Sequence, residues 1–399
     1  MKRFTLIIDG HNFFFRSLWS CFKQSSKTKI LSTQKDIDSY EKKMMIDFCS
    51  VVKSVSPIVN DIVFIRDSHS WRKDLLLEHE YKGNRKKTQD NIDMLGFGAA
   101  VNNFTDTLNN FGIKVSQVDM SEGDDLIYAW SKFLFDSGKS SLILSTDKDL
   151  NQLVKCVNDV HIIQYSPVAN KLYVSKESND IIKTISERKE VQMENLFDEL
   201  FTISIENDPF EKFISGLDIE EVYPEEIRFS KIIGGDVSDN IYPVYFKQGD
   251  GATKSKGLGP KTVKKIYDTF KGKLGCEFDY HIYSNDDVMK MLCNIIYEIA
   301  KIKDDEFTKR MLLENIRTNT KLVALTDESI PLEVIDNMTE NINEEKVKKS
   351  VILSKINREN IFAKSRFKEY RTNIQFDSTA VSGIKGIDTN GGNMNFIVD

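Results

Sequence analysis

Short apolar segments alternate with helix-like stretches over the first 175 residues, and this alternation limits the possible folds more than any other feature. The apolar segments are FTLII (4–8), DIVFIR (61–66), IKVSQV (113–118), SSLILST (140–146) and DVHIIQY (159–165). Helical patterns occupy about 36–54, 88–111 and 122–137. Because strands joined by helices pair in parallel and are covered on both faces, the sequence predicts an α/β fold with a mostly parallel sheet flanked by helices.

Three of the predicted strands deliver an aspartate to one edge of this sheet. Asp9 follows LII, Asp67 follows VFIR and Asp147 follows LILST. A single aspartate in such a place is also typical of a turn or an N-cap. Ligands of open α/β sheets bind at the carboxyl ends of the strands, so the three aspartates together predict a site there.

Six further acids accompany these aspartates. They are Glu122, Asp124 and Asp125 in EGDD, Asp149 shortly after Asp147, and Asp236 and Asp239 in GGDVSDN. If all nine gathered at one edge, they would repel one another strongly unless cations lay among them. Since oxygen ligands select hard ions, the sequence predicts two Mg²⁺ or Mn²⁺ ions rather than zinc.

Such a pair of ions suits phosphoryl transfer, because it stabilises both the attacking and the leaving oxygen of an in-line displacement. Bases for the phosphate follow in EYKGNRKK, namely Lys82, Arg85, Lys86 and Lys87, and Tyr81 before them is an aromatic that could stack on a nucleobase. The formal net charge of -6 argues against nucleic acid. Without the nine acids, however, 52 acids face 55 bases, a net charge of +3.

The motif GLGPKT predicts a second phosphate contact. Glycines allow close backbone approach, and Pro260 suits the first turn of a helix whose exposed amides bind anions. A simple turn is the alternative. The lysines around the motif favour binding to a duplex backbone. The predicted contacts are Gly257, Gly259, Lys261, Thr262, Lys264 and Lys265.

Composition excludes several other classes of protein. The 5 cysteines are scattered and never spaced CxxC, which argues against a zinc knuckle or a disulfide scaffold. No segment approaches 18 uncharged apolar residues. We therefore expect a monomeric cytoplasmic protein, in the host cytoplasm if it is viral, with no membrane association.

The ordered motifs IDGHN, RDSHSWRKD, EYKGNR, EGDD, STDKDLNQL, GGDVSDN and GLGPKT resemble the 5′ nuclease family. This family includes flap endonucleases, the 5′ nuclease domain of bacterial DNA polymerase I, and the bacteriophage 5′ exonuclease also called ribonuclease H. The resemblance covers about 1–175 and 229–270. It implies a PIN-like α/β nuclease domain with a helix-hairpin-helix module.

The resemblance also implies roles for the residues. Asp9, Asp67, Asp124 and Asp125, with Glu122, would surround one ion, and Asp147, Asp149, Asp236 and Asp239 the other. Lys82 and Arg85 would polarise the scissile phosphodiester, and Arg16 falls where the family has a phosphate-binding arginine. An arch for a 5′ single strand is implied between 83 and 112, and a K⁺ ion at the helix-hairpin-helix turn.

The implied activity is metal-dependent removal of 5′ flaps and RNA primers, as an exonuclease or flap endonuclease, during DNA replication or repair. Its substrates would be flapped or nicked duplex DNA and RNA:DNA hybrids. One alternative is a DNA-junction binding protein that no longer cleaves, although none of the nine acids is lost. Another is a PIN-type ribonuclease for single-stranded RNA, but such enzymes usually lack GGDVSDN and GLGPKT.

We divide the chain into a catalytic domain (1–175), an acidic insertion (176–228), a helix-hairpin-helix DNA-binding region (229–340) and a basic C-terminal extension (341–399). The acidic insertion is expected to face away from DNA. The extension is a candidate contact for a replication partner, either a single-strand binding protein or a sliding clamp. Two departures from the family stand out: Gly123 replaces a frequent alanine, and 13 residues, Val244 to Lys256, separate Pro243 from GLGPKT where relatives have only a few.

Overall fold

The computed structural model describes residues 4–22, 30–75, 80–83, 91–184, 209–247, 256–275, 285–302, 305–355, 387–388 and 395–396. The chain divides into two compact units, which we describe one after the other. Unit 1 comprises 1–69, 90–222 and 336–399, and unit 2 comprises 70–89 and 223–335. Within the described ranges, no helix has both the length and the apolar composition needed to cross a lipid bilayer.

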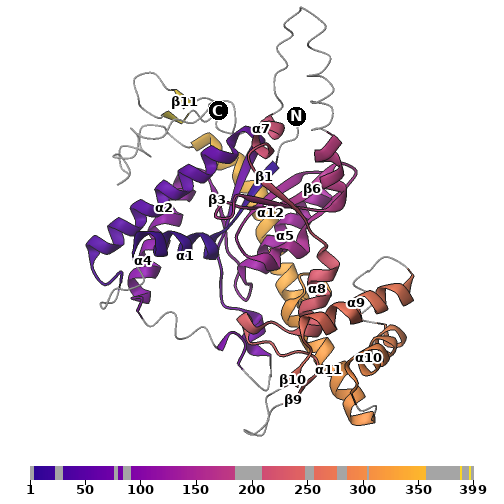
Figure 1. The fold of residues 1–399 in the computed structure, drawn as a ribbon. Coiled ribbons are helices and arrows are strands. Elements are labelled where there is room, and N and C mark those ends of the chain that lie inside the picture. Colours follow the sequence, from indigo (N-terminus) through magenta and orange to yellow (C-terminus); the bar gives the residue numbers. More distant parts are fainter. Residues whose placement is uncertain are drawn as a thin grey trace, which may run out of the picture. The chain divides into compact units, whose positions relative to one another are not determined.

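An eight-stranded sheet forms the centre of unit 1 (Figure 1). Its strands are β1 (Phe4–Asp9), β2 (Val59–Ile65), β3 (Lys114–Ser116), β4 (Ser140–Leu144), β5 (Lys155–Val157), β6 (Val160–Ser166), β7 (Lys171–Val174) and β8 (Asp218–Glu221). They lie in the order β3-β2-β1-β4-β6-β7-β8, with β5 also paired to β6. Neighbours from β3 to β6 are parallel, whereas β5 and β7 run antiparallel to β6. The predicted mostly parallel α/β sheet is therefore confirmed.

Helices cover both faces of this sheet. Leu6 and Ile8 of β1 share a core with α1 (Gly10–Cys21), α2 (Gln34–Val55) and α4 (Met94–Asn110). In that core the rings of Phe13, Phe64 and Phe104 lie 5.5 to 5.7 Å apart. Because side chains alternate along a strand, Ile7 faces the opposite side, where α5 (Gly123–Asp136) packs on β1 and β4. Short 3-10 helices cover Ser56–Ile58 (η1) and Lys148–Leu153 (η4).

The helix α4 begins later than the sequence indicates. Asp93 caps it, since its Oδ1 accepts hydrogen bonds from the amides of Leu95 (3.0 Å) and Gly96 (3.3 Å). The helix buries Ala100, Phe104 and Leu108 completely in the core of unit 1. Residues 94–110 are thus a core helix, which does not agree with the arch that the resemblance places at 83–112.

The second half of the predicted acidic insertion is part of the sheet. Phe210 and Ile214 of α7 (Pro209–Ile214) are buried in the core of unit 1. The strand β8 pairs in parallel with β7, and Lys171 on β7 bonds to Asp218 (3.0 Å) and Glu220 (2.6 Å) on β8. Asp218 and Glu220 are therefore edge-strand residues, and the boundary drawn at 228 differs from the structural one near 222. Residues 185–208 lie outside the described part.

The helix α12 (Leu332–Lys355) crosses the boundary drawn at 340. In unit 1, Ser116 Oγ on β3 donates a hydrogen bond to Asn341 Oδ1 (2.6 Å), and Ser121 Oγ lies 3.5 Å from Met338 Sδ. The start of the predicted extension is therefore packed against β3. Two short strands, β11 (Ile387–Asp388) and β12 (Asn395–Phe396), pair with each other further on, and the other residues after 355 lie outside the described part.

Unit 2 is mainly helical (Figure 1). Its elements are η2 (Trp71–Asp74), α8 (Pro224–Gly234), η5 (Val237–Asp239), β9 (Phe246–Lys247), β10 (Lys256–Gly257), α9 (Pro260–Leu274), α10 (Asp286–Ala300) and α11 (Glu306–Val323), followed by the start of α12. Its core includes Phe229, Ile232, Val263, Phe270 and Ile296, each at most 3% exposed. The helices α8 and α9 carry the two glycine-rich motifs at their ends.

Candidate functional site

Asp9 is the last residue of β1 and the N-cap of α1. Its Oδ1 accepts a hydrogen bond from the Asn12 amide (3.0 Å), and its Oδ2 accepts one from Ser145 Oγ (2.6 Å). Only 6% of the residue is exposed. Burial raises the pKa of Asp9 to about 6, opposed in part by the Ser145 hydroxyl and assisted by the charge of Asp67. Two carboxylates thus repel each other at this edge, and a cation between them would relieve the repulsion.

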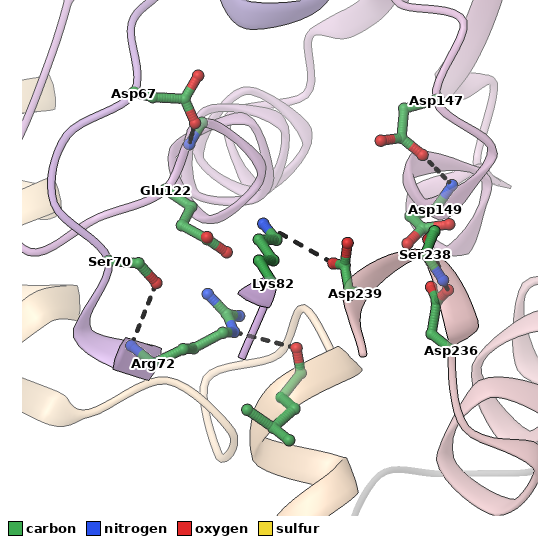
Figure 2. Close-up of polar contacts among 12 residues, drawn as sticks. Asp67, Ser70, Arg72, Lys82, Glu122, Asp147, Asp149, Asp236, Ser238 and Asp239 are labelled. Atoms are coloured by element: carbon green, nitrogen blue, oxygen red, sulfur yellow. Dashed lines mark hydrogen bonds and ion pairs between the residues drawn. The ribbon is translucent and has the colours of Figure 1, made fainter. Parts of the chain in front are cut away.

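Asp67 follows β2, the neighbour of β1. Its Oδ1 accepts a hydrogen bond from the Gly123 amide at the start of α5 (2.7 Å; Figure 2), and its Oδ2 lies 3.5 Å from His11 Nδ1. A helix N-terminus favours such a negative charge. A Cβ atom at Gly123 would lie 3.1 Å from Asp67 Oδ1, which is tighter than ordinary contact. Glycine in place of the family's frequent alanine therefore lets the carboxylate approach closely.

The start of α5 places its three acids differently. Glu122 is the N-cap and is 8% exposed, and Asp124 is half-buried. Asp125 is completely buried, and its Oδ2 accepts a hydrogen bond from the Glu122 amide (3.2 Å). One oxygen of Asp125 therefore takes part in a capping box. The family resemblance gives Asp125 only as a metal ligand and does not indicate this local role.

The third strand-end acid, Asp147, is tied to Asp9 through one hydroxyl. Ser145 Oγ donates to Asp9 and accepts a hydrogen bond from the Asp147 amide (3.0 Å). Asp147 Oδ1 in turn accepts one from the Asp149 amide (2.9 Å; Figure 2). The Ser145 hydroxyl thus fixes the position of Asp147, after β4, relative to Asp9, at the end of β1.

Two amide side chains that the sequence analysis missed support this edge. Gln164 on β6 is completely buried, and its Nε2 donates to the carbonyls of Ser145 (3.1 Å) and Asp147 (2.6 Å). Asn12 Nδ2 donates to Thr146 Oγ1 (2.6 Å). The sequence contains a signal for each of them. Gln164 is an amide within the otherwise apolar segment DVHIIQY, and Asn12 is the last residue of the motif IDGHN.

Asp236 and Asp239 lie in unit 2, in the tight loop after α8. Asp236 Oδ1 accepts hydrogen bonds from the Ser238 amide (2.8 Å) and hydroxyl (2.6 Å; Figure 2), and its Oδ2 accepts one from Lys231 Nζ (2.6 Å). Burial opposes ionisation of Asp236, but Lys231 and Ser238 outweigh it and lower the pKa. Asp236 is therefore an ionised, paired carboxylate.

The geometry of this loop predicts a large effect of Gly235→Ala. Gly235 has φ +71°, and a Cβ atom there would lie 2.4 Å from the Ile241 carbonyl oxygen. We expect a loss of about 2 to 4 kcal/mol in the free energy of unfolding, measured by urea denaturation. Gly234→Ala is the matched control, because its Cβ would meet only a Val263 methyl at 3.2 Å. Equal stability of the two variants would contradict the described loop.

Lys82 lies beside Asp239 (Figure 2). The Lys82 amide donates to the Asp239 carbonyl (2.9 Å), and Lys82 Nζ lies 3.7 Å from Asp239 Oδ2. The Asn240 side chain adds a hydrogen bond to the Glu80 carbonyl (2.8 Å). Two predicted site residues from distant parts of the sequence are therefore neighbours within unit 2.

Tyr81 does not have the exposure that stacking on a nucleobase requires. It is 6% exposed and packs against Ile241 and Leu322. Lys82 Nζ also lies 5.0 Å from the centre of its ring. The prediction of a base contact at Tyr81 is therefore wrong in this structure. The buried ring instead packs the segment that carries Lys82 against Ile241 and Leu322.

Arg72 anchors the same segment and was missed by the sequence analysis. It is 2% exposed, and its Nε donates to the Leu322 carbonyl in the last turn of α11 (3.1 Å; Figure 2). Its guanidinium also lies 4.6 Å from the centre of the Trp71 ring. A cation suits the C-terminal end of a helix, so Arg72 ties η2 to α11.

Arg16 is half-buried on α1. Burial lowers its pKa, while the charges of Asp47 and Asp9 act in the opposite direction. The charge of Asp9 therefore acts on the Arg16 guanidinium, in keeping with the predicted position of Arg16 near the acids. Arg85, Lys86 and Lys87 lie outside the described residues.

The start of α9 has the form of an anion site. Gly259 is the N-cap without a side-chain cap, Pro260 follows, and the first turn contains no acid. Lys261 and Lys265 are exposed. Lys264 Nζ instead pairs with Glu226 (2.8 Å) and Asp268 (3.1 Å), and the bond to Glu226 is the main cause of its raised pKa. The predicted DNA contact at Lys264 would have to compete with two carboxylates.

The donor set fits a hard divalent ion, because every predicted ligand is a carboxylate oxygen. Seven of the nine acids belong to unit 1, and Asp236 and Asp239 belong to unit 2. In the part of the chain that the structure describes, no three His, Cys, Asp or Glu side chains are grouped as a ready metal site. Several carboxylates accept hydrogen bonds from nearby amides instead. The gathering of nine acids around two ions therefore stays a prediction.

Residues 4–192 match the model of the 5'-3' exonuclease N-terminal resolvase-like domain. This match covers somewhat less than half of the chain. The chain is 22% identical to the 5'-3' exonuclease of Mycoplasma pneumoniae over 79% of this chain and 86% of that protein. It is 28% identical to the flap endonuclease Xni of Shewanella denitrificans over 31% of this chain and 45% of that protein.

Solved structures share the fold of this chain. The T5 D15 protein co-crystallised with metal ions has a TM-score of 0.50 at 17% identity, over 86% of this chain and 99% of that one. T5 5'-exonuclease with bound zinc also has a TM-score of 0.50, at 18% identity, over the same 86% and 99%. The predicted α/β fold with a mostly parallel sheet is thus shared with these structures.

Proposed function

We propose that this protein is a 5′ nuclease, a divalent-metal-dependent enzyme that removes 5′ flaps and RNA primers from duplex DNA. The arrangement of Asp9, Asp67 and Asp147 carries the proposal, because three adjacent parallel strands deliver them to one edge of the sheet. The family match and the relatives named as exonuclease and flap endonuclease support it. Flapped and nicked DNA and RNA:DNA hybrids are the proposed substrates.

The proposed cofactors are two Mg²⁺ or Mn²⁺ ions. In unit 1 their ligands would be Asp9, Asp67, Glu122, Asp124, Asp125, Asp147 and Asp149, and unit 2 would add Asp236 and Asp239. Bound there, the ions would supply charge stabilisation for an in-line displacement at phosphorus. The repulsion between Asp9 and Asp67 supports this, since a cation would relieve it. The family resemblance further suggests K⁺ at the GLGPKT turn.

Cationic and backbone groups would bind the DNA phosphates. Lys82 is proposed to hold the scissile phosphate through its ammonium, and Arg16 a neighbouring one. The uncapped amides of the first turn of α9, with Lys261 and Lys265 beside them, would hold the duplex backbone. These contacts would hold the nucleic acid while the acids and their ions act on the phosphodiester.

A cleavage assay tests the proposal. The protein is incubated with a 5′-labelled flap, a nicked duplex and an RNA:DNA hybrid, with Mg²⁺ or with chelator. We expect short 5′ products with Mg²⁺ and none with chelator. Cleavage that chelator does not affect would reject metal dependence, and binding without cleavage would favour the alternative of a junction-binding protein.

Lys82→Ala should slow cleavage without weakening metal binding. Since the ammonium would stabilise charge on the reacting phosphate, we expect kcat to fall about a hundredfold, with little change in the Mg²⁺ concentration at half-maximal rate. Single-turnover kinetics on the flap measure this. Lys132→Ala is the control, because Lys132 forms a surface pair with Asp136 on α5 (3.1 Å). An unchanged rate for Lys82→Ala would remove Lys82 from the mechanism.

A further inference from the structure

A stacked aromatic pair, one ring of which is exposed, lies between the acidic loop of unit 2 and the strand β9. The rings of Tyr242 and Phe246 are stacked, with centroids 4.8 Å apart and planes 16° from parallel. Tyr242 is 44% exposed, and Val237 in the same loop is 89% exposed. Large aromatic side chains are usually covered, and exposed apolar groups that gather in one place mark binding sites.

The backbone that carries this pair is held firmly. Asp236 and Ile241 exchange two main-chain hydrogen bonds (2.9 and 2.8 Å). Asn319 Nδ2 donates to the Tyr242 carbonyl (3.0 Å), and Asn315 Nδ2 donates to the Val244 carbonyl (2.8 Å). The exposed ring therefore projects from a preorganised support, which reduces the entropy lost when a ligand binds.

The pair lies between two places that bind charge in the proposed function. Asp239 belongs to the loop just before it, and Lys82 Nζ lies 3.7 Å from Asp239 Oδ2. On the other side, a Cβ atom at Gly257 would lie 3.0 Å from Pro243 Cγ and 3.4 Å from Phe246 Cδ2, so the GLGPKT turn packs directly on the aromatic pair. The anion site at the start of α9 follows within three residues.

We propose that Tyr242 and Phe246 form a stacking platform for a nucleobase of the substrate. The base is one whose face is uncovered where the duplex ends, at a nick or a flap junction. Its own strand would be held by the amides of α9. This inference rests on the proposed function and adds to it a base contact made by the aromatic pair of unit 2. Stacking on aromatic side chains is tolerant of sequence, so the platform would recognise the junction rather than a particular base.

The test uses a 5′-flap duplex with 2-aminopurine at the junction, in chelator so that it is not cleaved. Anisotropy gives the Kd, and 2-aminopurine fluorescence reports stacking. For Tyr242→Leu we expect a Kd raised about tenfold and loss of the fluorescence quenching seen with the wild type. Tyr242→Phe should restore both. Phe307→Leu is the control, because Phe307 is 79% exposed elsewhere in unit 2.

The outcomes separate the two proposals. If the wild type binds the flap and Tyr242→Leu matches it in Kd and quenching, the platform is overturned while the proposed function stands. If the wild type does not bind the flap at all, the proposed function falls and the platform with it. Equal melting temperatures for Tyr242→Leu and Tyr242→Phe would exclude misfolding as the cause of weak binding, and a duplex with an abasic site at the junction should reduce wild-type affinity to that of Tyr242→Leu.

Discussion

Asp9→Asn is expected to abolish metal-dependent cleavage and, at the same time, to stabilise the metal-free protein. The rate should fall about a thousandfold or more, because the proposed metal site loses a charge at its centre. The free energy of unfolding near pH 7.5 should rise by about 1 to 3 kcal/mol, since a buried charge is removed. Flap cleavage and urea unfolding measure the two effects.

The substitution should preserve the local hydrogen bonds. The amide oxygen of the introduced asparagine would still accept a hydrogen bond from the Asn12 amide, and its amide nitrogen could donate to the Ser145 hydroxyl, which then acts as acceptor. Asp136→Asn, at a surface pair with Lys132, is the control. A variant Asp9→Asn that cleaves within tenfold of the wild-type rate would contradict the site.

The second large effect is a pH dependence of stability in the absence of metal. The folded-state pKa of Asp9 is about 6 and its ordinary value is 3.8, so between these values the folded protein keeps a proton that the unfolded chain has released. The contribution of Asp9 to stability is therefore greatest below pH 4 and is lost as the pH rises to 6, by about 3 kcal/mol. Mg²⁺ should restore stability above pH 6, where it binds the ionised carboxylate.

Urea unfolding from pH 4 to 8, with chelator or with Mg²⁺, measures this loss. Other groups also titrate, and the lowered pKa of Asp236 acts in the opposite direction, so the informative quantity is the difference between wild type and Asp9→Asn. That difference should grow between pH 4 and 6 in chelator and shrink with Mg²⁺. A difference that stays constant with pH would show that Asp9 is not perturbed by burial.

The sheet and its acidic edge could be predicted from the sequence because local patterns determine them. Apolar segments specify strands, the helices between them specify parallel pairing, and parallel neighbours bring Asp9, Asp67 and Asp147 to one edge. The closeness of Lys82 and Asp239, by contrast, was not predicted from the sequence. No local pattern indicates that these two residues share a main-chain hydrogen bond.

Other features depend on contacts between distant residues and could not be predicted. Tyr81 looks like a free aromatic beside a basic segment, but Ile241 and Leu322 bury it. The acidic stretch looks like an insertion, yet β8 pairs with β7 at the end of the sheet, and Lys171 on β7 forms ion pairs with the acids of β8. Asp125 looks like a metal ligand, although capping already uses one of its oxygens. For Tyr81 and for the acids of β8, the contacting residues lie outside the sequence motif that suggested the function. For Asp125, the contacting group is a backbone amide.

The closeness of Lys82 Nζ to Asp239 Oδ2 has a thermodynamic consequence. The two side chains form an ion pair with each other. A cation bound to the carboxylate would weaken this pair and favour an anion at the ammonium, and a phosphate bound to the ammonium would favour a cation at the carboxylate. Reciprocity of linkage then requires that each ligand raise the affinity for the other by the same factor, so metal and DNA would load onto this unit cooperatively.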